Sequence, residues 1–201
     1  MKKNHWFIFV ILCILILVLP GCLKTNIIEQ SGNVVAIGYD ANKNGIKNTS
    51  VFYQVDPRAM EKVQVVVTSA KTSKGSNEAV NNEVSKKSLL GQLRVAIYSQ
   101  ELSRHGILSL VDAMSRDPSI GTMVYLAVSE VKAEELLTKR YPEIANIGSY
   151  LYGSLRQNIR EGNVPSCTLH EFLRAYYSQG DDPILPIILS QGTEVRLNGL
   201  A

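Results

Sequence analysis

The chain has 201 residues, of which 45% are hydrophobic and 19% are charged, with a formal net charge of +3. These are the proportions of a globular protein, and they exclude both a disordered chain and a protein with several membrane spans. Lys2 and Lys3 carry two of the positive charges, so the rest of the chain is close to neutral and gives no electrostatic reason to expect nucleic acid as a partner.

The first 21 residues have the three parts of a secretory signal peptide. Lys2 and Lys3 form the positive region, residues 6–19 form an uncharged apolar region, and Pro20 and Gly21 end that run just before Cys22. The apolar region has the length found in signal peptides and is shorter than the ~20 residues that a membrane-spanning helix needs. We therefore expect residues 1–21 to be removed from the mature protein.

Leu19-Pro20-Gly21-Cys22 resembles the bacterial lipobox, in which diacylglycerol is attached to the cysteine and the signal is cut just before it. Pro20 stands at the position where small residues are usual. Cys22 is the predicted lipidation site, and its diacylglycerol and N-acyl chains would hold the domain stably at a membrane. The alternative is an uncleaved apolar anchor with an incidental cysteine, which the short apolar region disfavours.

The other cysteines support the same picture. Cys13 would leave with the signal and Cys22 would be acylated, so Cys167 is the one thiol expected in the mature chain, and no intramolecular disulfide can form. Cys167 has no activating neighbour in the sequence. Because free cysteine is among the most buried residue types, we expect it to pack in the core rather than act as a nucleophile.

Three strands are predicted after a polar tether at residues 22–33. They are residues 34–39, 48–55 and 63–69. The hexapeptide at residues 40–45 is rich in Asn, Asp and Gly and predicts a hairpin connection. It also matches the first half of an EF-hand loop, but Val51 stands where the bidentate glutamate is required, so we expect no calcium site.

A polar loop at residues 71–75 precedes a helix predicted at residues 77–90, with Ser76 as its N-cap. The loop could bind an anion, because a helix N-terminus favours negative charge. It lacks the glycine spacing of a Walker A motif, and a solvated loop is the preferred interpretation.

Residues 93–128 predict a β-α-β unit. An apolar run at residues 93–98 is followed by Ser99 as an N-cap, a helix that ends before Pro118, and a second apolar run at residues 122–128. Such a unit needs a sheet with at least one covered face. The predicted fold class is therefore α+β (mixed α/β), with helices packed on a mixed sheet.

Further helices are predicted at residues 132–139, 142–160 and 168–177. Thr168 and Glu171 form a capping box, so the adjacent His170 and Glu171 are not interpreted as a catalytic pair. A turn at residues 180–183 leads to a strand at 184–189, in which Pro186 requires an edge or bulge position. Residues from 195 onward have the alternation of a strand, with no terminating signal and no evident partner.

These elements suggest a domain organisation. We expect a signal peptide at 1–21, a lipidated tether at 22–33, a mixed α/β domain at 34–182, and the start of a following, truncated region at 183–201.

Several motifs in order then resemble one family. They are the lipobox cysteine, Val-Val-Ala-Ile-Gly-Tyr-Asp at 34–40, Gly-Gln-Leu-Arg-Val-Ala-Ile-Tyr-Ser-Gln-Glu-Leu at 91–102, Gly-Ile-Leu-Ser-Leu-Val-Asp at 106–112, Arg-Asp-Pro at 116–118, Pro-Ile-Leu-Pro at 183–186 and Val-Arg-Leu-Asn-Gly at 195–199. The chain resembles the C subunit of spore germinant receptors, the GerAC/GerKC-type lipoproteins of the Ger(x)C family. The resemblance implies a three-domain, non-enzymatic lipoprotein on the outer face of the spore inner membrane. It would act in nutrient-triggered germination with a membrane-spanning A subunit and a transporter-like B subunit.

Two other classes of protein remain as alternatives. A substrate-binding lipoprotein of a transporter would be a two-lobed and usually longer chain. A cell-surface hydrolase would carry a nucleophile elbow, a zinc-binding helix or a cysteine-rich metal motif, and the sequence has none of these. We therefore predict no enzyme activity, no catalytic residue, no metal site and no cofactor, apart from the covalent lipid on Cys22.

Overall fold

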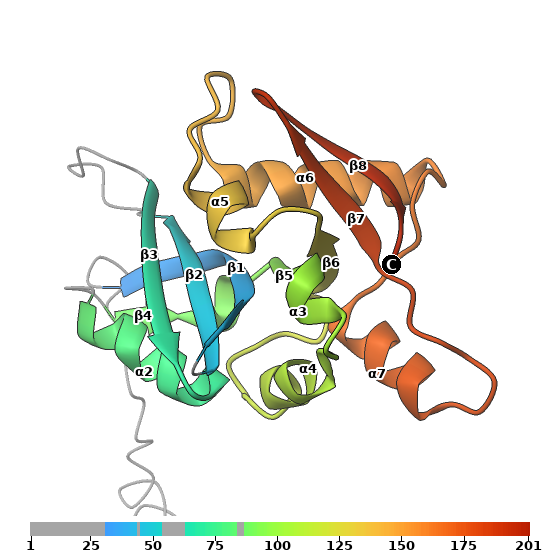
Figure 1. The fold of residues 1–201 in the computed structure, drawn as a ribbon, viewed down its shortest axis with the longest axis horizontal. Coiled ribbons are helices and arrows are strands. Elements are labelled where there is room, and N and C mark those ends of the chain that lie inside the picture. The colour runs from blue at the N-terminus through green and yellow to red at the C-terminus, as the bar shows by residue number, and fades with distance from the viewer. Residues whose placement is uncertain (1–30, 44, 54–62, 84–86) are drawn as a thin grey trace, which may run out of the picture.

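The computed structural model describes residues 31–43, 45–53, 63–83 and 87–201, and these form one sheet with helices on both of its faces (Figure 1). The strand order across the described sheet is β3-β2-β1-β5-β6-β7-β8, and β4 pairs with β1 off this path. The strands are β1 (Ser31–Asn42), β2 (Gly45–Tyr53), β3 (Val63–Ala70), β4 (Lys87–Leu89), β5 (Val95–Ser99), β6 (Tyr125–Ser129), β7 (Pro186–Gln191) and β8 (Glu194–Leu200). The helices are α2 (Ser73–Glu83), α3 (Gln100–Ser103), α4 (Leu108–Ser115), α5 (Ala133–Thr138), α6 (Ile147–Arg160) and α7 (Leu169–Tyr177), with a 3-10 turn η2 (Leu90–Gln92).

The sheet is mixed, which confirms the predicted α+β class. Its centre is parallel, because β1 pairs with β5, β5 with β6, and β6 with β7 in the parallel sense. Its two edges are antiparallel hairpins, formed by β1, β2 and β3 on one side and by β7 and β8 on the other.

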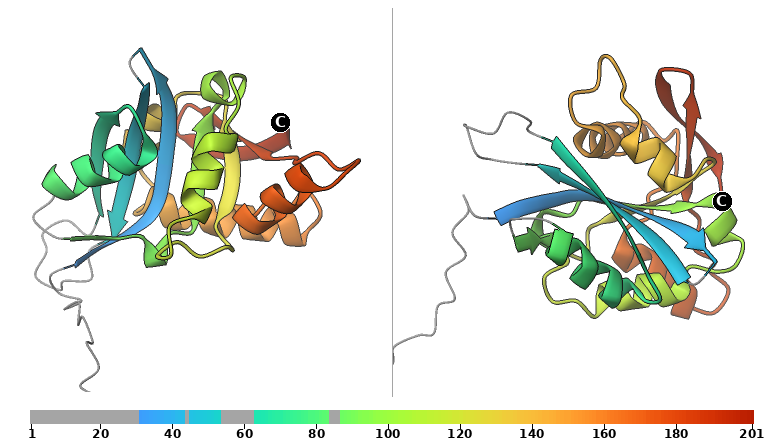
Figure 2. Two further views of the ribbon diagram at one scale, coloured as in Figure 1. Left: turned by 90° about the horizontal axis from the view of Figure 1, so that it is seen from below. Right: turned by 60° about the vertical axis from the view of Figure 1, so that its left-hand side comes forward.

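Each face of the sheet has its own apolar core. Helices α2, α4 and α7 cover one face and lie in front of the strands when the molecule is seen from below (Figure 2). Val80, Met114 and Phe172 are buried there against Ile37 and Tyr98. Helices α5 and α6 cover the other face, where their leucines pack on the central strands. The central strands are buried on both faces, which explains why their sequences are continuous apolar runs rather than alternating ones.

The predicted β-α-β unit is present, with one difference inside its helical part. Strands β5 and β6 pair from Val95 opposite Tyr125 to Ser99 opposite Ser129, and the Ser99 side chain accepts a hydrogen bond from the Leu102 N–H at 3.4 Å. The helix that the sequence predicts as one piece is split into α3 and α4. Gly106 lies between them with φ of +91°, a left-handed conformation that ends α3 and that glycine adopts without strain.

Three predicted helix boundaries are wrong. The predicted N-cap Ser76 lies inside α2 and is buried, with its hydroxyl 3.2 Å from that of Thr68, and Leu89 belongs to β4 rather than to the helix. Helix α6 begins at Ile147, five residues later than predicted, because the Asn146 side chain accepts a hydrogen bond from the Ser149 N–H at 2.9 Å and caps it there.

Residues 183–201 add the last two strands to the same sheet. Strand β7 lies beside β6, and β8 pairs with β7, with Leu197 opposite Ile188, so the strand predicted from residue 195 has a partner. Pro186 is the first residue of β7, and the register with β8 is irregular between Pro186 and Ile188, which confirms the predicted bulge position for the proline.

Candidate functional site

The predicted lipidation site, Cys22, lies outside the described residues, as do the signal peptide and most of the tether. None of the helices described from residue 31 onward is long and apolar enough to cross a membrane.

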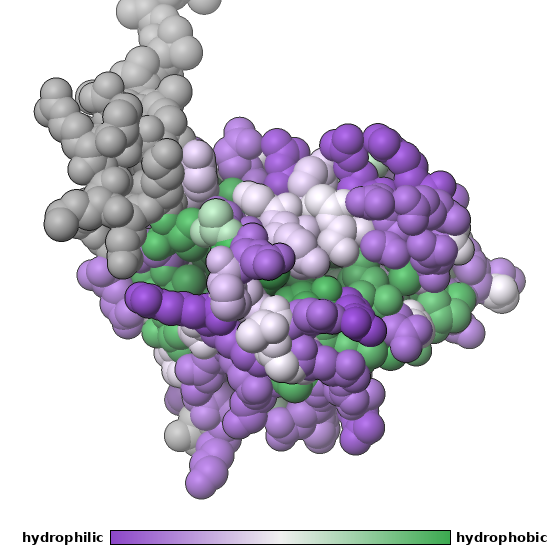
Figure 3. Space-filling view, turned by 90° about the horizontal axis from the view of Figure 1, so that it is seen from above, coloured by the Kyte–Doolittle hydropathy of each residue, from purple (hydrophilic) through white to green (hydrophobic). Residues whose placement is uncertain are grey.

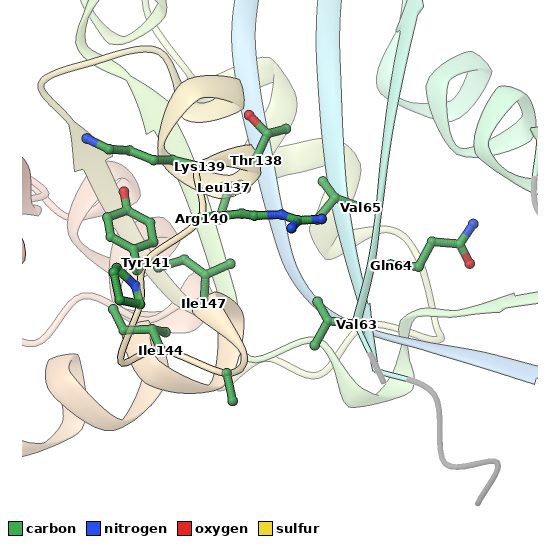
Figure 4. Close-up of a pocket in the computed structure, with 12 residues that line it drawn as sticks. Val63, Gln64, Val65, Leu137, Thr138, Lys139, Arg140, Tyr141, Ile144 and Ile147 are labelled. Atoms are coloured by element: carbon green, nitrogen blue, oxygen red, sulfur yellow. The ribbon is translucent and has the colours of Figure 1, made fainter. Parts of the chain in front are cut away.

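A hollow lies between β3 and the segment that joins α5 to α6 (Figure 4). It has a volume of about 750 Å³, with Val63 and Val65 on one side and Leu137, Ile144 and Ile147 on the other. The same face of the molecule, seen from above, shows apolar side chains broken up by hydrophilic ones rather than a single large apolar patch (Figure 3). We call this hollow the β3 groove.

The rim of the β3 groove is cationic. The Arg140 side chain extends across the groove toward Val65 (Figure 4), and Lys139 Nζ lies 5.6 Å from the centre of the Tyr141 ring. Among the described residues that line the groove there is no Asp, Glu, His or Cys. The groove can thus hold an apolar or anionic group.

A buried carboxylate lies where β1 meets α5, and the sequence analysis missed it. Asp40 is 2% exposed, and its Oδ1 and Oδ2 accept hydrogen bonds from the N–H groups of Ala133 (2.7 Å) and Glu134 (2.8 Å). Lys47 pairs with the Glu134 carboxylate at 2.8 Å beside it. Asp40 therefore satisfies the first turn of a helix and is not available to a ligand. The one sequence signal for it is an Asp directly after a buried strand, and the sequence alone places that residue in the predicted hairpin connection at 40–45.

Cys167, the cysteine among the described residues, is buried in the core. Cys167 is 2% exposed, and burial, together with the nearby Glu171, raises the pKa of its thiol to about 12. Burial and the raised pKa both disfavour the thiolate form that would attack a substrate. The expectation that Cys167 packs in the core is confirmed.

His170 and Glu171 also take structural positions. The Glu171 carboxylate accepts a hydrogen bond from the Thr168 N–H at 2.8 Å, and the Glu171 N–H donates to the Thr168 hydroxyl at 3.2 Å, which confirms the capping box. His170, the helix residue directly before Glu171, is exposed. Among the described residues no group of three or more His, Cys, Asp or Glu side chains is placed to hold a metal ion.

Comparison with known proteins shows the family of the chain, which the contacts described above do not reveal. The family model described as "Spore germination protein N-terminal domain" matches residues 24–189. The spore germination protein GerQC of Bacillus cereus is 30% identical over 199 residues, which are 98% of this chain and 55% of that protein. The chain thus spans little more than half the length of that relative. No solved structure matches it significantly. The family resemblance drawn from the sequence motifs is confirmed, and the chain belongs to the Ger(x)C family of spore germination proteins.

Proposed function

We propose that this protein is a lipid-anchored, non-enzymatic subunit of a nutrient germinant receptor. It is held by Cys22 at the outer face of the spore inner membrane. There it acts in germination through contacts with the membrane-embedded A and B subunits of the receptor.

One observation carries the proposal. The match to the spore germination family begins at residue 24, two positions after the lipobox cysteine, and runs to residue 189. The chain therefore has the order of a lipoprotein: a signal-like segment, an acylatable cysteine and then the family domain. In this proposal the protein is attached to the membrane through the lipid on Cys22.

The non-enzymatic part of the proposal is supported by the chemistry of the described residues. The Cys167 thiol is buried with a raised pKa, Asp40 is used by α5, and Glu171 is used by α7. The β3 groove offers apolar and cationic side chains. Such a surface suits contacts with another molecule, and the described lining carries neither the His nor the carboxylates that most often act as general acids and bases.

The test is metabolic labelling with a fatty acid, followed by membrane fractionation and a germination assay, in sporulating cells that carry the wild-type gene or the variant Cys22→Ala. We expect label, membrane association and nutrient response to be lost together in Cys22→Ala. The matched control is Cys13→Ala, which removes a cysteine from the predicted signal and is expected to leave all three unchanged.

Two results would refute the proposal. Absence of label in the wild-type protein would show that it has no lipid anchor, and normal germination after deletion of the gene would show that it has no receptor role.

A substrate-binding lipoprotein of a transporter is the second candidate, because the volume of the β3 groove is in the range of small-molecule sites. Saturable binding of a labelled nutrient by the purified protein, abolished by Arg140→Glu, would favour that candidate.

A further inference from the structure

A second, smaller hollow lies at the beginning of β1. It has a volume of about 240 Å³, and Asn33, Tyr53, Arg94 and Tyr152 are among the residues that line it. Tyr53 lies opposite Asn33 in the β1–β2 ladder, and the Arg94 N–H donates to the Val35 carbonyl at 3.0 Å. The ladder and this bond bring together the beginning of β1, the end of β2 and the residue before β5. We call it the β1-start hollow.

Its side chains are those found where a protein meets lipid headgroups. Arg94 is exposed, and its guanidinium lies 5.9 Å from the centre of the Tyr152 ring, which holds it over an aromatic face. Its Nη2 donates to the Gln92 side-chain oxygen at 3.1 Å, and within the described chain it has no carboxylate partner. Tyr53 is 38% exposed. Tyrosine combines an apolar ring with a polar hydroxyl and is enriched at membrane–water interfaces, and arginine binds lipid phosphates.

The length of the tether limits which end of the domain can face the bilayer. Residues 23–30 alone separate Cys22 from Ser31, and even fully extended they span at most about 30 Å. Strand β1 has 12 residues, so its two ends lie roughly 35 Å apart, at about 3.3 Å per residue. An orientation with β1 upright and its hairpin end on the membrane would put Ser31 beyond the reach of the tether. The β1-start end, which carries the arginine and the tyrosines, is the end that can always reach the surface.

We infer that the β1-start hollow is the surface with which the domain rests on anionic phospholipid headgroups. Arg94 pairs with a lipid phosphate, and the rings of Tyr53 and Tyr152 lie at the level of the headgroups. The inference rests on the lipidation of Cys22 proposed above. Its consequence is a fixed orientation, in which the Lys43 end of the β1–β2 hairpin points away from the membrane.

The experiment uses tryptophan fluorescence, because the sole tryptophan, Trp6, lies in the segment that signal cleavage removes. Lipidated full-length protein carrying Tyr53→Trp, Tyr152→Trp or Lys43→Trp is reconstituted into vesicles of phosphatidylglycerol and phosphatidylethanolamine with brominated acyl chains. Lys43 is exposed at the far end of β1 and is the matched control. Two near positions are used, so that a folding defect in one variant does not decide the result.

We expect several-fold stronger bromine quenching of Tyr53→Trp and Tyr152→Trp than of Lys43→Trp. The difference should shrink when Arg94→Glu is added or when phosphatidylcholine replaces phosphatidylglycerol. Equal quenching at the near and far positions, or stronger quenching at Lys43→Trp, would overturn the inference. The inference would also be overturned if Tyr53→Trp showed no bromine quenching and chemical crosslinking instead joined this surface to a second copy or to another protein.

The same samples separate this inference from the proposed function. Mass spectrometry of the N-terminal peptide reports whether Cys22 carries lipid, and vesicle flotation reports attachment. Loss of both would refute the anchor and the orientation together. Lipidated, attached protein without preferential quenching would refute the orientation alone.

Discussion

Asp40 and Ala133 are 93 residues apart, yet the Asp40 carboxylate accepts the Ala133 N–H at 2.7 Å and closes the open end of α5. Lys132, the residue before the helix, makes no side-chain cap, so Asp40 supplies from β1 what the local sequence does not. The bond couples the last part of β1 to the helix that forms one wall of the β3 groove. A buried carboxylate that accepts hydrogen bonds from backbone N–H groups generally stabilises a fold more than a surface ion pair does.

Replacing Asp40 with alanine leaves the N–H groups of Ala133 and Glu134 without an acceptor. We expect Asp40→Ala to lower the free energy of unfolding by about 2–3 kcal/mol, measured by urea denaturation. Asp40→Asn keeps one side-chain oxygen and should cost about half as much. The control, Asp182→Ala, changes an exposed turn aspartate and should shift stability by less than about 0.5 kcal/mol. Equal stability of Asp40→Ala and Asp182→Ala would contradict the assigned role.

Two glycines in α6 should respond to alanine with opposite signs. A Cβ at Gly148 would lie 2.8 Å from the Val35 Cγ2 and 3.0 Å from the Ala36 Cβ, whereas nothing lies within 4 Å of a Cβ at Gly153. Gly148→Ala should therefore destabilise the protein by about 1–3 kcal/mol through overpacking against β1. Gly153→Ala should stabilise it by about 0.5–1 kcal/mol through helix propensity.

Thermal and urea denaturation of the two variants side by side is the measurement. Propensity alone predicts the same sign at both positions, so a gain in stability at Gly148 would show that α6 does not pack on β1 as closely as described.

The capping box of α7 predicts a pH dependence of stability. Burial raises the pKa of Glu171, but hydrogen bonds from the Thr168 N–H and the Ser166 hydroxyl outweigh it, so the pKa lies below its ordinary value. A carboxyl whose pKa is lower in the folded state contributes stability above its unfolded pKa of about 4.3. That contribution is lost as the pH falls through the folded pKa.

Urea denaturation at neutral and at acidic pH measures this effect. Glu171→Gln should lose stability relative to wild type at neutral pH and approach wild type in acid, because protonated Glu171 and glutamine are then both neutral. Glu143→Gln, at an exposed carboxylate, is the matched control and should follow wild type across the range. A gap between Glu171→Gln and wild type that stayed constant with pH would refute the assignment.

The sequence predicted what depends on neighbours along the chain. The apolar runs of β5 and β6, the Ser99 cap and the Thr168 capping box are local signals, and all are present. The division between α3 and α4 was missed because a glycine inside an apolar periodic stretch does not reveal its φ. Gly106 adopts +91° only as part of the folded turn.

What the sequence missed depends on contacts between distant segments. The role of Asp40 needs α5 to arrive beside β1, and the β3 groove needs residues 137–147 to lie next to β3. The sequence predicts strands at residues 184–189 and from 195 but not their place beside β6, because the parallel pairing of β7 with β6 leaves no local signature. Cys22 shows the reverse case, in which a local motif gives a specific chemical prediction outside the described residues.

The last prediction concerns the thiol of Cys167. Because the side chain is 2% exposed and its pKa is raised to about 12, maleimide at neutral pH should label it only after the protein unfolds. Ser109→Cys places a thiol on the exposed side of α4 and should be labelled rapidly in the native protein. With Cys22 acylated, the wild type should then show no rapid labelling, and urea should expose one thiol per chain. If Cys167 in the native protein were labelled as fast as the thiol of Ser109→Cys, α7 would have to open from the sheet. If the wild type showed one rapidly labelled thiol and Cys167→Ala showed it too, that thiol would be an unacylated Cys22.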